Sequence, residues 1–375
     1  MRRGVARFLR RSAWSTFALV SLAVVVSACS PPAAACVEGV RPMSPVSGGE
    51  GPIRQTSPHV AALALRYEPT VEMSVLDGFW PVSVATVLKE RDRRGDGVQL
   101  VANGRVIDDP AELADLKSSS NANAYLNYPA GLTDKRGQIQ AFLRGLGAAE
   151  SVIDAWPTDL SAVVRRSAQI YFYDAGTGCS YPGADTRGYL ALQYWFFYGL
   201  NYYPMTVDTP TMLTAPLKAD TADIDWHEGD WEHITVLLEQ HGSDYVPRYV
   251  WMARHSSEGK LNPWADVQHD GGGHPVVYPA FGGHPSYPTC GAHPRALLAA
   301  AVYDYVSCSP GLYTIRAADT RLVDLSSVSW SCWPGYFGTT LGTKASGDAD
   351  DPTGQILVAG PRSPLRQAEN QHACK

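Results

Sequence analysis

The sequence predicts a mainly β fold. Aromatic residues are abundant, glycine and proline are frequent at 34 and 27 of 375 residues, and only 18% of the residues are charged. The segment YLALQYWFFYGLNYYP (189–204) is rich in aromatic residues and is bounded by Gly188 and Pro204, which is typical of a buried strand. Buried aromatic side chains usually serve packing alone, so we expect this strand to form core.

Other segments fit the same fold class. Prolines mark the edges or turns of two further expected strands, YVPRYVWMARHS (245–256) and HPVVYPAFGG (274–283). Helical periodicity is strongest in residues 135–148 and 158–170, which are the peripheral helices that we expect. The loops that connect these elements are expected to be long.

The first 28 residues have the pattern of a lipoprotein-type signal peptide. Five arginines flank the start of an apolar run, FALVSLAVVV, which is too short for a transmembrane helix. The sequence VSAC (26–29) resembles a bacterial lipobox, in which the cysteine becomes the lipidated first residue of the mature protein. The alternative is an ordinary signal peptide with a cysteine nearby. The lipobox predicts an exported protein, anchored to the outer face of the cell membrane by more than one acyl chain on Cys29.

Three segments are expected after the signal peptide. Residues 29–57 are rich in proline, glycine, serine and alanine, so we expect a flexible tether from the membrane. Residues 58–343 are expected to form one domain, because no break in composition marks a linker. Residues 344–375 are expected to form a polar C-terminal tail.

The mature chain is acidic and holds enough cysteines for a disulfide framework. Removal of the signal peptide leaves 26 basic and 37 acidic residues, a net charge of −11, which argues against nucleic acid as a partner. If Cys29 carries lipid, an even set of cysteines remains, which predicts up to three disulfides in an exported chain. These cysteines are Cys36, Cys179, Cys290, Cys308, Cys332 and Cys374.

The stretch DTADIDWHEGDWEH (220–233) places many acidic residues directly before the apolar sequence ITVLL. If residues 230–239 form a strand, Asp230 and Glu232 lie on its most apolar face, because side chains alternate. An unpaired carboxylate is costly to bury. Residues 219–247 contain no lysine or arginine, so the partner must come from elsewhere in the fold or be a cation.

A divalent cation suits this segment. Asp230 and Glu232 stand two residues apart on one strand face, and His227, expected in the turn before the strand, can reach the same point. A fourth ligand is expected from one of Asp220, Asp223 and Asp225. Oxygen ligands with a single imidazole favour Ca²⁺ or Mg²⁺, with Mn²⁺ also suitable, over Zn²⁺. The alternative is an acidic loop that faces water before an ordinary strand.

The segment HEGDWEHITVLLE (227–239) resembles the Vps62-like family. The resemblance also rests on LQYWFFYGLNYY before this segment and HPVVYPAFGGHPSYP after it. The early stretch LALRYEPTVEMSVLDGFWPVSV is similar to the N-terminal segment of that family. Together these motifs cover about residues 60–290, and they are fairly specific as a set.

A more distant likeness is to the necrosis- and ethylene-inducing peptide 1-like proteins (NPP1 domain), secreted cytolysins that carry the heptapeptide G-H-R-H-D-W-E. In that family the first histidine, the aspartate and the glutamate help to bind a divalent cation, and they correspond here to His227, Asp230 and Glu232. The likeness implies a β-sandwich core that binds the sugars of sphingolipid head groups. Here Trp226 replaces the leading glycine and Gly229 replaces the second histidine, and the chain is longer. These departures bear on cytolytic activity rather than on the metal site.

Further polar residues are expected to line a cleft near the cation. His284 lies in the part that resembles the G-x-H-x-x-Y-P segment of the Vps62-like family, and His255 follows an expected strand. With Tyr278 and Tyr287 they are candidates to bind a sugar or a phosphate. The alternative is that the His-Pro pairs in this glycine-rich sequence are surface turns.

Three functions fit these features. The first is binding, in which the cation and aromatic residues hold a lipid head group, a sugar or a phosphate. The second is a metal-dependent hydrolase of an ester or phosphodiester, with His284 or His233 as general base. Strand alternation, which places His233 on the face opposite Asp230 and Glu232, counts against His233. The third is a structural role in the cell envelope, in which the cation fixes a turn.

Overall fold

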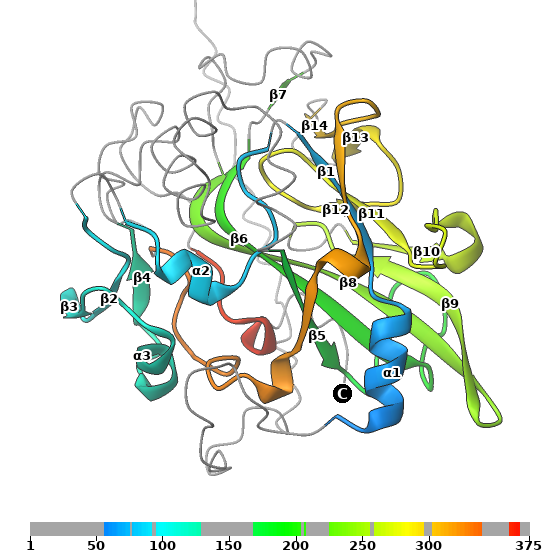
Figure 1. Cartoon of the computed structure of the whole chain (residues 1–375), viewed down its shortest axis with the longest axis horizontal. Coiled ribbons are helices and arrows are strands. Elements are labelled where there is room, and N and C mark those ends of the chain that lie inside the picture. Colours follow the sequence, from blue (N-terminus) through cyan, green and yellow to red (C-terminus); the bar gives the residue numbers. More distant parts are fainter. Residues whose placement is uncertain are drawn as a thin grey trace, which may run out of the picture.

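A six-stranded sheet, with the strand order β10-β9-β8-β6-β5-β16, forms the centre of the fold (Figure 1). The computed structural model describes residues 56–75, 77–91, 95–128, 168–203, 206–207, 225–255, 259–295, 302–339 and 360–367. The sheet consists of β5 (Gln169–Asp174), β6 (Leu190–Tyr203), β8 (Asp225–His241), β9 (Asp244–Met252), β10 (Lys260–Pro263) and β16 (Arg321–Asp324). The three strands expected at 189–204, 230–239 and 245–256 are therefore confirmed as β6, β8 and β9.

The two longest strands, β6 and β8, pair antiparallel in one continuous register from Leu190–Leu238 to Tyr203–Asp225. The five successive aromatic residues of β6 from Tyr194 to Tyr198 are fully buried. Both faces of the sheet are therefore covered here, which explains why the strand is apolar throughout rather than alternating. The strand β8 begins before His227, so the expectation that His227 lies in a turn is wrong.

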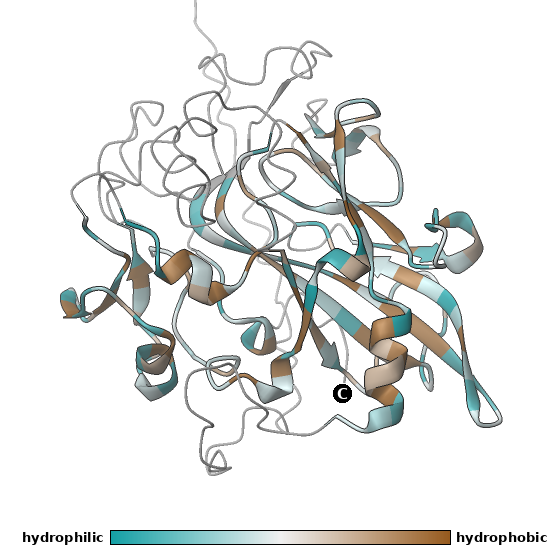
Figure 2. Ribbon diagram, in the orientation of Figure 1, coloured by the Kyte–Doolittle hydropathy of each residue, from teal (hydrophilic) through white to brown (hydrophobic). Residues whose placement is uncertain are grey.

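A second, four-stranded sheet packs against the first and completes a β-sandwich core. Its order is β12-β11-β1-β15, and it consists of β1 (Thr70–Ser74), β11 (Val276–Pro279), β12 (Ser286–Tyr287) and β15 (Leu312–Ile315). Val71 and Val277 of this sheet share one hydrophobic cluster with Ile234 and Val236 of β8. Figure 2 shows apolar residues along these strands and a hydrophilic tip on the β8–β9 hairpin. The predicted mainly β class is confirmed.

The remaining elements lie around this core. Helix α1 (Pro58–Arg66) covers the central sheet, where Tyr194 of β6 donates a hydrogen bond to the carbonyl of Ala64. Two short helices, α2 (Val84–Leu88) and α3 (Leu113–Ser118), accompany a peripheral sheet of β2 (Gln99–Ala102), β3 (Arg105–Asp108) and β4 (Tyr125–Asn127) (Figure 1). A second three-stranded sheet consists of β7 (Thr206–Val207), β13 (Gly291–Arg295) and β14 (Val302–Val306). The 3₁₀ helices are Trp264–Asp266, Ala317–Asp319, Leu325–Ser327 and Pro364–Arg366.

The two peripheral helices expected from periodicity lie almost entirely outside the described residues. The range 135–148 lies outside the described residues, as do residues 158–167 of the second expected helix. Its last residues are not helical, because Ala168 forms an isolated bridge with Val82 and β5 starts at Gln169. From residue 169 on, β5 pairs with β6, so these last residues belong to the central sheet. Among the described residues, no helix is long and apolar enough to cross a membrane.

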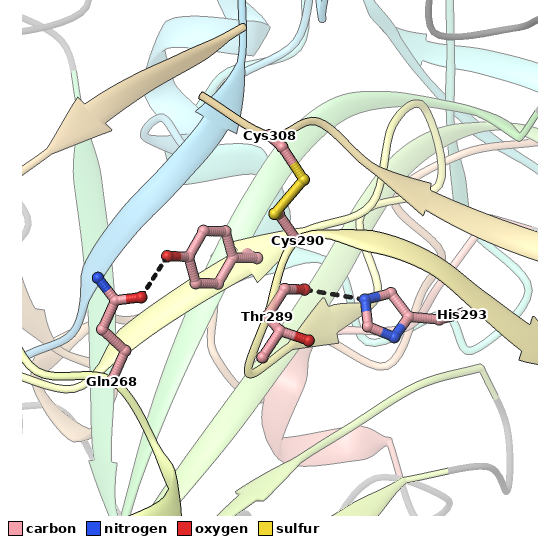
Figure 3. The surroundings of a disulfide bond; sticks show 6 residues. Gln268, Thr289, Cys290, His293 and Cys308 are labelled. Atoms are coloured by element: carbon pink, nitrogen blue, oxygen red, sulfur yellow. Dashed lines mark hydrogen bonds between the residues drawn. A yellow bond between two sulfur atoms is a disulfide. The ribbon is translucent and has the colours of Figure 1, made fainter. Parts of the chain in front are cut away.

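The expected disulfide framework is present in the C-terminal half. Cys290 and Cys308 form a disulfide that joins the start of β13 to the segment after β14 (Figure 3). Cys332, and Cys179 in the first half of the chain, each take part in a disulfide as well. Beside the first bridge, His293 Nε2 donates to the carbonyl of Thr289 at 2.8 Å, which fixes the imidazole against the strand.

Glu68, between α1 and β1, makes the stability of the fold depend on pH. Burial raises the pKa of its carboxyl to about 7, against the opposing hydrogen bond from Thr320. The native state therefore keeps a proton that the unfolded chain releases near its ordinary pKa of 4.5, so stability falls as pH rises through this window. In the wild type the free energy of unfolding is expected to fall by about 3 kcal/mol between pH 4.5 and pH 7. Glu68→Gln is expected to abolish this fall, because glutamine does not titrate. Chemical denaturation across pH checks this, and a variant that loses stability as steeply as the wild type contradicts it.

Candidate functional site

The strand β8 carries Asp230 and Glu232 into the middle of the protein. They pair in register with Tyr198 and Phe196 of β6, which fixes their backbone on that side, whereas the pairing of β8 with β9 begins only at Ile234. Asp230 is buried, whereas Glu232 is only partly buried. As predicted from the sequence, both acidic residues lie beside core residues, and their own strand offers no lysine or arginine as a partner.

A histidine from a distant segment supplies the partner of Asp230. His284 is fully buried, and its Nδ1 lies 2.9 Å from Oδ2 of Asp230. Its Nε2 lies 3.4 Å from Oδ2 of Asp77, a residue of the turn after β1. Tyr198 stacks flat on the imidazole, with 3.8 Å between the ring centroids. His284 thus bridges two acids that are far apart in the sequence, and an aromatic ring covers one face.

The charge of His284 follows from these contacts. Burial alone would lower the pKa of the imidazole, but Asp77 and the hydrogen bond to Asp230 raise it to about 9. Asp77 is itself held in place, because its two oxygens accept the backbone N–H groups of Phe79 and Gly282 at 3.0 Å. At neutral pH the imidazole is therefore positively charged, and it is the basic partner from elsewhere in the fold that Asp230 requires.

A second network surrounds Asp304 on β14. His255 Nε2 lies 2.8 Å from Oδ2 of Asp304, and the hydroxyl of Tyr287 donates a short hydrogen bond to the same oxygen. Burial alone would raise the pKa of Asp304, but the hydrogen bond and charge of His255 hold it below its usual value. The other oxygen, Oδ1, is buried and has no hydrogen-bond partner among the described residues. An anionic carboxylate with one free buried oxygen is available to a further ligand.

Glu232 is influenced by the charges of both networks. Burial, and then the negative charges of Asp230 and Asp304, raise the pKa of the Glu232 carboxyl well above its usual range. Three carboxylates from two elements thus share one region, and no lysine or arginine is among the causes that shift Glu232. Repulsion between these carboxylates favours either a proton or a cation among them.

Tyr287 is positioned by neighbours on its ring. The guanidinium carbon of Arg254 lies 4.0 Å from the ring centroid, and the His293 ring stacks on it at 3.9 Å. Arg254 is oriented by a hydrogen bond from Nε to the carbonyl of Ser286. With its hydroxyl on Asp304, Tyr287 orients the carboxylate rather than offering an open ring to a sugar.

The other predicted ligand residues that the structure describes form hydrogen bonds outside the two networks. Tyr278, opposite Tyr287 in the β11–β12 pair, donates its hydroxyl to Gln268 Oε1 at 2.7 Å. His227 Nδ1 donates to the carbonyl of Gly229, which leaves Nε2 to accept from the amide of Asn201 at 3.1 Å. Asp223, Asp220 and Cys29 lie outside the described residues. Within the described ranges, no group of three or more His, Cys, Asp or Glu side chains is arranged to hold a metal ion.

Two of the predicted histidines have an unusual backbone. His255 and His284 have φ angles of 43° and 58°, and the turn residue Asn103 is the other non-glycine residue with a positive φ in the described chain. Such conformations cost free energy, and they persist where surrounding contacts impose them. Here the contacts are the hydrogen bonds to Asp304 and Asp230, so both imidazoles are aimed at carboxylates.

His233, the other candidate base, is also fully buried. Its ring stacks on Trp195, its partner across the β6–β8 pair, with 4.2 Å between the centroids. It therefore contributes to the aromatic core of the sheet, which agrees with the expectation that it faces away from Asp230.

Sequence reasoning missed Asp77 and Asp304. Both left a signal in the sequence: Asp77 precedes an apolar run in VLDGFWP, and Asp304 is the lone acid in the aromatic strand VYDYV. A charged residue inside an apolar strand requires a buried partner, as it does for Asp230. Their proximity to β8 depends on chain topology, which the spacing of residues does not contain.

Comparison with known proteins supports the resemblance seen in the sequence. The model of the family described as vacuolar protein sorting-associated protein 62 (Vps62) matches residues 188–297. Necrosis and Ethylene inducing Protein 2, from the causal agent of cocoa's Witches Broom disease, is similar at 14% identity with a TM-score of 0.20. That match covers 43% of this chain and 52% of the other, so it spans about half of the solved structure. No curated protein matches the chain. The predicted resemblance to the Vps62 family is thus confirmed over residues 188–297, which include Asp230, Glu232, His255 and His284.

Proposed function

We propose that this chain is a cell-envelope lipoprotein that holds a divalent cation among Asp230, Glu232 and Asp304 and uses it to bind a small polar ligand. The ligand class is a lipid head group, a sugar or a phosphate. Two observations support the proposal. The charges of Asp230 and Asp304 reach Glu232 and raise the pKa of its carboxyl, although the three side chains are not arranged as a metal site, and Oδ1 of Asp304 is buried without a hydrogen-bond partner among the described residues.

The donor set favours a hard cation. Carboxylate oxygens and water are the ligands of Ca²⁺ and Mg²⁺, and Mn²⁺ accepts them as well. Asp230 and Asp304 are already oriented by His284 and His255, as ligating groups usually are by hydrogen bonds of their own. Glu232 would complete the site with its carboxylate, and the cation would leave positions for an oxygen-bearing ligand. His227 and Asp223 remain the further ligands expected from the sequence.

Metal analysis of the mature chain without lipid tests the cation. The wild type is expected to retain stoichiometric Ca²⁺, Mg²⁺ or Mn²⁺ by mass spectrometry, and Asp230→Asn and Glu232→Gln are expected to lose it. A chelator should lower the Tm of the wild type alone, because binding to the native state stabilises it by about 3 kcal/mol at a cation concentration 100-fold above Kd. Glu239→Gln, an exposed position of the same strand, is the matched control.

The same variants also show whether a bound cation or a proton on Glu232 relieves the repulsion between the carboxylates. Without a cation, Glu232→Gln removes a repelled carboxylate and should leave stability unchanged or raise it. With a cation, the variant should be less stable than the wild type until chelator is added. A Glu232→Gln protein that melts above the wild type in both conditions contradicts the cation site.

Membrane attachment through Cys29 is the second part of the proposal. It is supported by the lipobox-like sequence VSAC and the apolar run that precedes it. The wild type is expected to fractionate with membranes, and Cys29→Ser is expected to be released in soluble form or retained with its signal peptide uncleaved. A Cys29→Ser variant that is cleaved and still fractionates with membranes contradicts lipid anchoring.

The hydrolase alternative receives less support from the geometry. A general base must accept a proton at the working pH. His284 is fully buried, both of its nitrogens lie against carboxylates, and its pKa of about 9 keeps it protonated at neutral pH. These properties favour a residue that orients Asp230 over one that activates water.

A further inference from the structure

A cavity of about 700 Å³ lies on a different part of the molecule from the carboxylate cluster. It is bordered by residues of α2 and α3, the start of β5, the start of β16 and the segment at Trp330. Figure 1 shows where these elements lie. None of the residues that form the carboxylate cluster lines it. Its volume is within the range of sites that hold small organic molecules.

The lining of this cavity is basic, although the chain as a whole carries a net charge of −6. Four of its residues are cationic and one, Glu112, is acidic; the cations are Lys89, Arg91, Lys117 and Arg321. In the described ranges no ion pair involves Lys89, Lys117 or Arg321, all of which are exposed. Cations that converge on a concave surface raise the local concentration of anions.

Arg91 is fixed in position. Its Nη1 donates to the carbonyls of Leu88 and Glu90 at 2.9 and 2.6 Å, which leaves Nε and Nη2 to donate elsewhere. Gly97 permits this arrangement, because a Cβ at that position would lie 2.9 Å from Nη1. A guanidinium held by its own backbone is suited to bidentate binding of a phosphate, since little side-chain entropy is lost.

The cavity also offers an apolar wall. Trp330 is 1% exposed and is held edge-on by Tyr171, with 5.5 Å between the ring centroids. Leu88 and Leu113 line the cavity beside it. A ligand that fills this space therefore has an anionic end and an apolar or aromatic body.

We propose that this cavity is a second ligand site, for an organic phosphomonoester with an apolar body. The phosphate would lie between Arg91 and the exposed cations, and the body would lie against the partly exposed Leu113, beneath which Trp330 is buried. This inference is independent of the cation site. The phosphomonoester is either a soluble metabolite or the head group of a lipid, and the experiment separates the two sources.

Calorimetric titration of the full mature chain with phenyl phosphate tests the proposal. Saturable one-to-one binding is expected, with a Kd below about 1 mM at low salt. Inorganic phosphate, which lacks the apolar body, should bind more weakly. Lys89→Glu and Lys117→Glu should each weaken phenyl phosphate binding about tenfold. Lys260→Glu, an exposed lysine on β10 that does not line the cavity, should leave binding unchanged.

A second arm uses vesicles of phosphatidylcholine with or without phosphatidic acid, whose head group is a phosphomonoester. If the protein binds the phosphatidic acid vesicles, and if phenyl phosphate inhibits and Lys89→Glu abolishes this binding, the site is supported and its ligand is a lipid. Phenyl phosphate binding without vesicle binding supports it with a soluble source. The absence of saturable phenyl phosphate binding, or equal losses in Lys89→Glu and Lys260→Glu, overturns the proposal.

Discussion

Replacement of His284 with alanine is expected to lower the free energy of unfolding by about 4 kcal/mol at pH 7. The imidazole is fully buried between Asp77 and Asp230, so its removal leaves two buried carboxylates without their positive partner. The substitution also leaves a cavity beside Tyr198, because the ring of Tyr198 stacks on the imidazole in the wild type. Urea denaturation followed by far-UV circular dichroism measures the loss.

Two controls make the His284 result specific. His241→Ala removes an exposed histidine at the far end of β8, which bonds Glu239 at 2.8 Å, and it should change stability by less than about 1 kcal/mol. In a double-mutant cycle, Asp77→Asn should cost less in the His284→Ala background than in the wild type, because the pair is already broken. Additive losses would show that Asp77 and His284 act independently and would contradict the bridge.

The second large effect is expected from Gly229→Ala, which should lower stability by about 3 kcal/mol or more. Gly229 has a φ of 61°, and a Cβ there would lie 2.3 Å from the carbonyl oxygen of Phe337. Because the clash is with backbone, a side chain cannot swing away, and the 337–339 segment must move from β8. Glu228 would lose its place in the same shift, since its carboxylate accepts the N–H of Thr339.

Gly242 provides a matched control for this substitution. It lies in the β8–β9 turn with a φ of 64°, and a Cβ there would have no atom within 4 Å. Gly242→Ala therefore carries the backbone cost alone, about 1 kcal/mol. The difference between the two variants measures the contact with Phe337. Equal losses would show that this contact is absent in solution.

Gly229 also accounts for one departure from the NPP1 heptapeptide. The second histidine of that motif corresponds to this position, where the 337–339 segment leaves no room for a side chain. The local sequence HEGDW contains the glycine but not the reason for it. That reason is a segment more than a hundred residues later in the chain, so it follows only from the tertiary structure.

The central strands were predictable because their signals are local. The aromatic run of β6 and the apolar run of β8 each specify a buried strand, and alternation placed Asp230 and Glu232 correctly beside the core. His255, which follows an expected strand, and His284, which belongs to a motif, were also predicted to lie near these acids. Each now contacts a carboxylate of the cluster.

The remaining parts of the site were not predictable, because they depend on which segments meet. Asp77 and Asp304 come from opposite ends of the domain, and neither belongs to the motif that drew attention to β8. Tyr278 matched the expected pattern as well as Tyr287 did, yet it points to Gln268 rather than to Asp304. Strand register and turn geometry decide the direction in which each tyrosine points, because a shift of one residue moves a side chain to the other face of the sheet.

The position of β1 has a consequence for how the chain folds. This strand lies between β11 and β15, so residue 70 pairs with residue 276 and residue 71 with residue 315. Contacts of such long range slow folding, because the intervening loop must close before they form. A chain synthesised from its N-terminus cannot complete the sandwich until β15 has emerged, and it therefore stays extended for a long time. Slow folding of this kind would keep the chain unfolded during the export that we propose, because translocation requires an unfolded polypeptide.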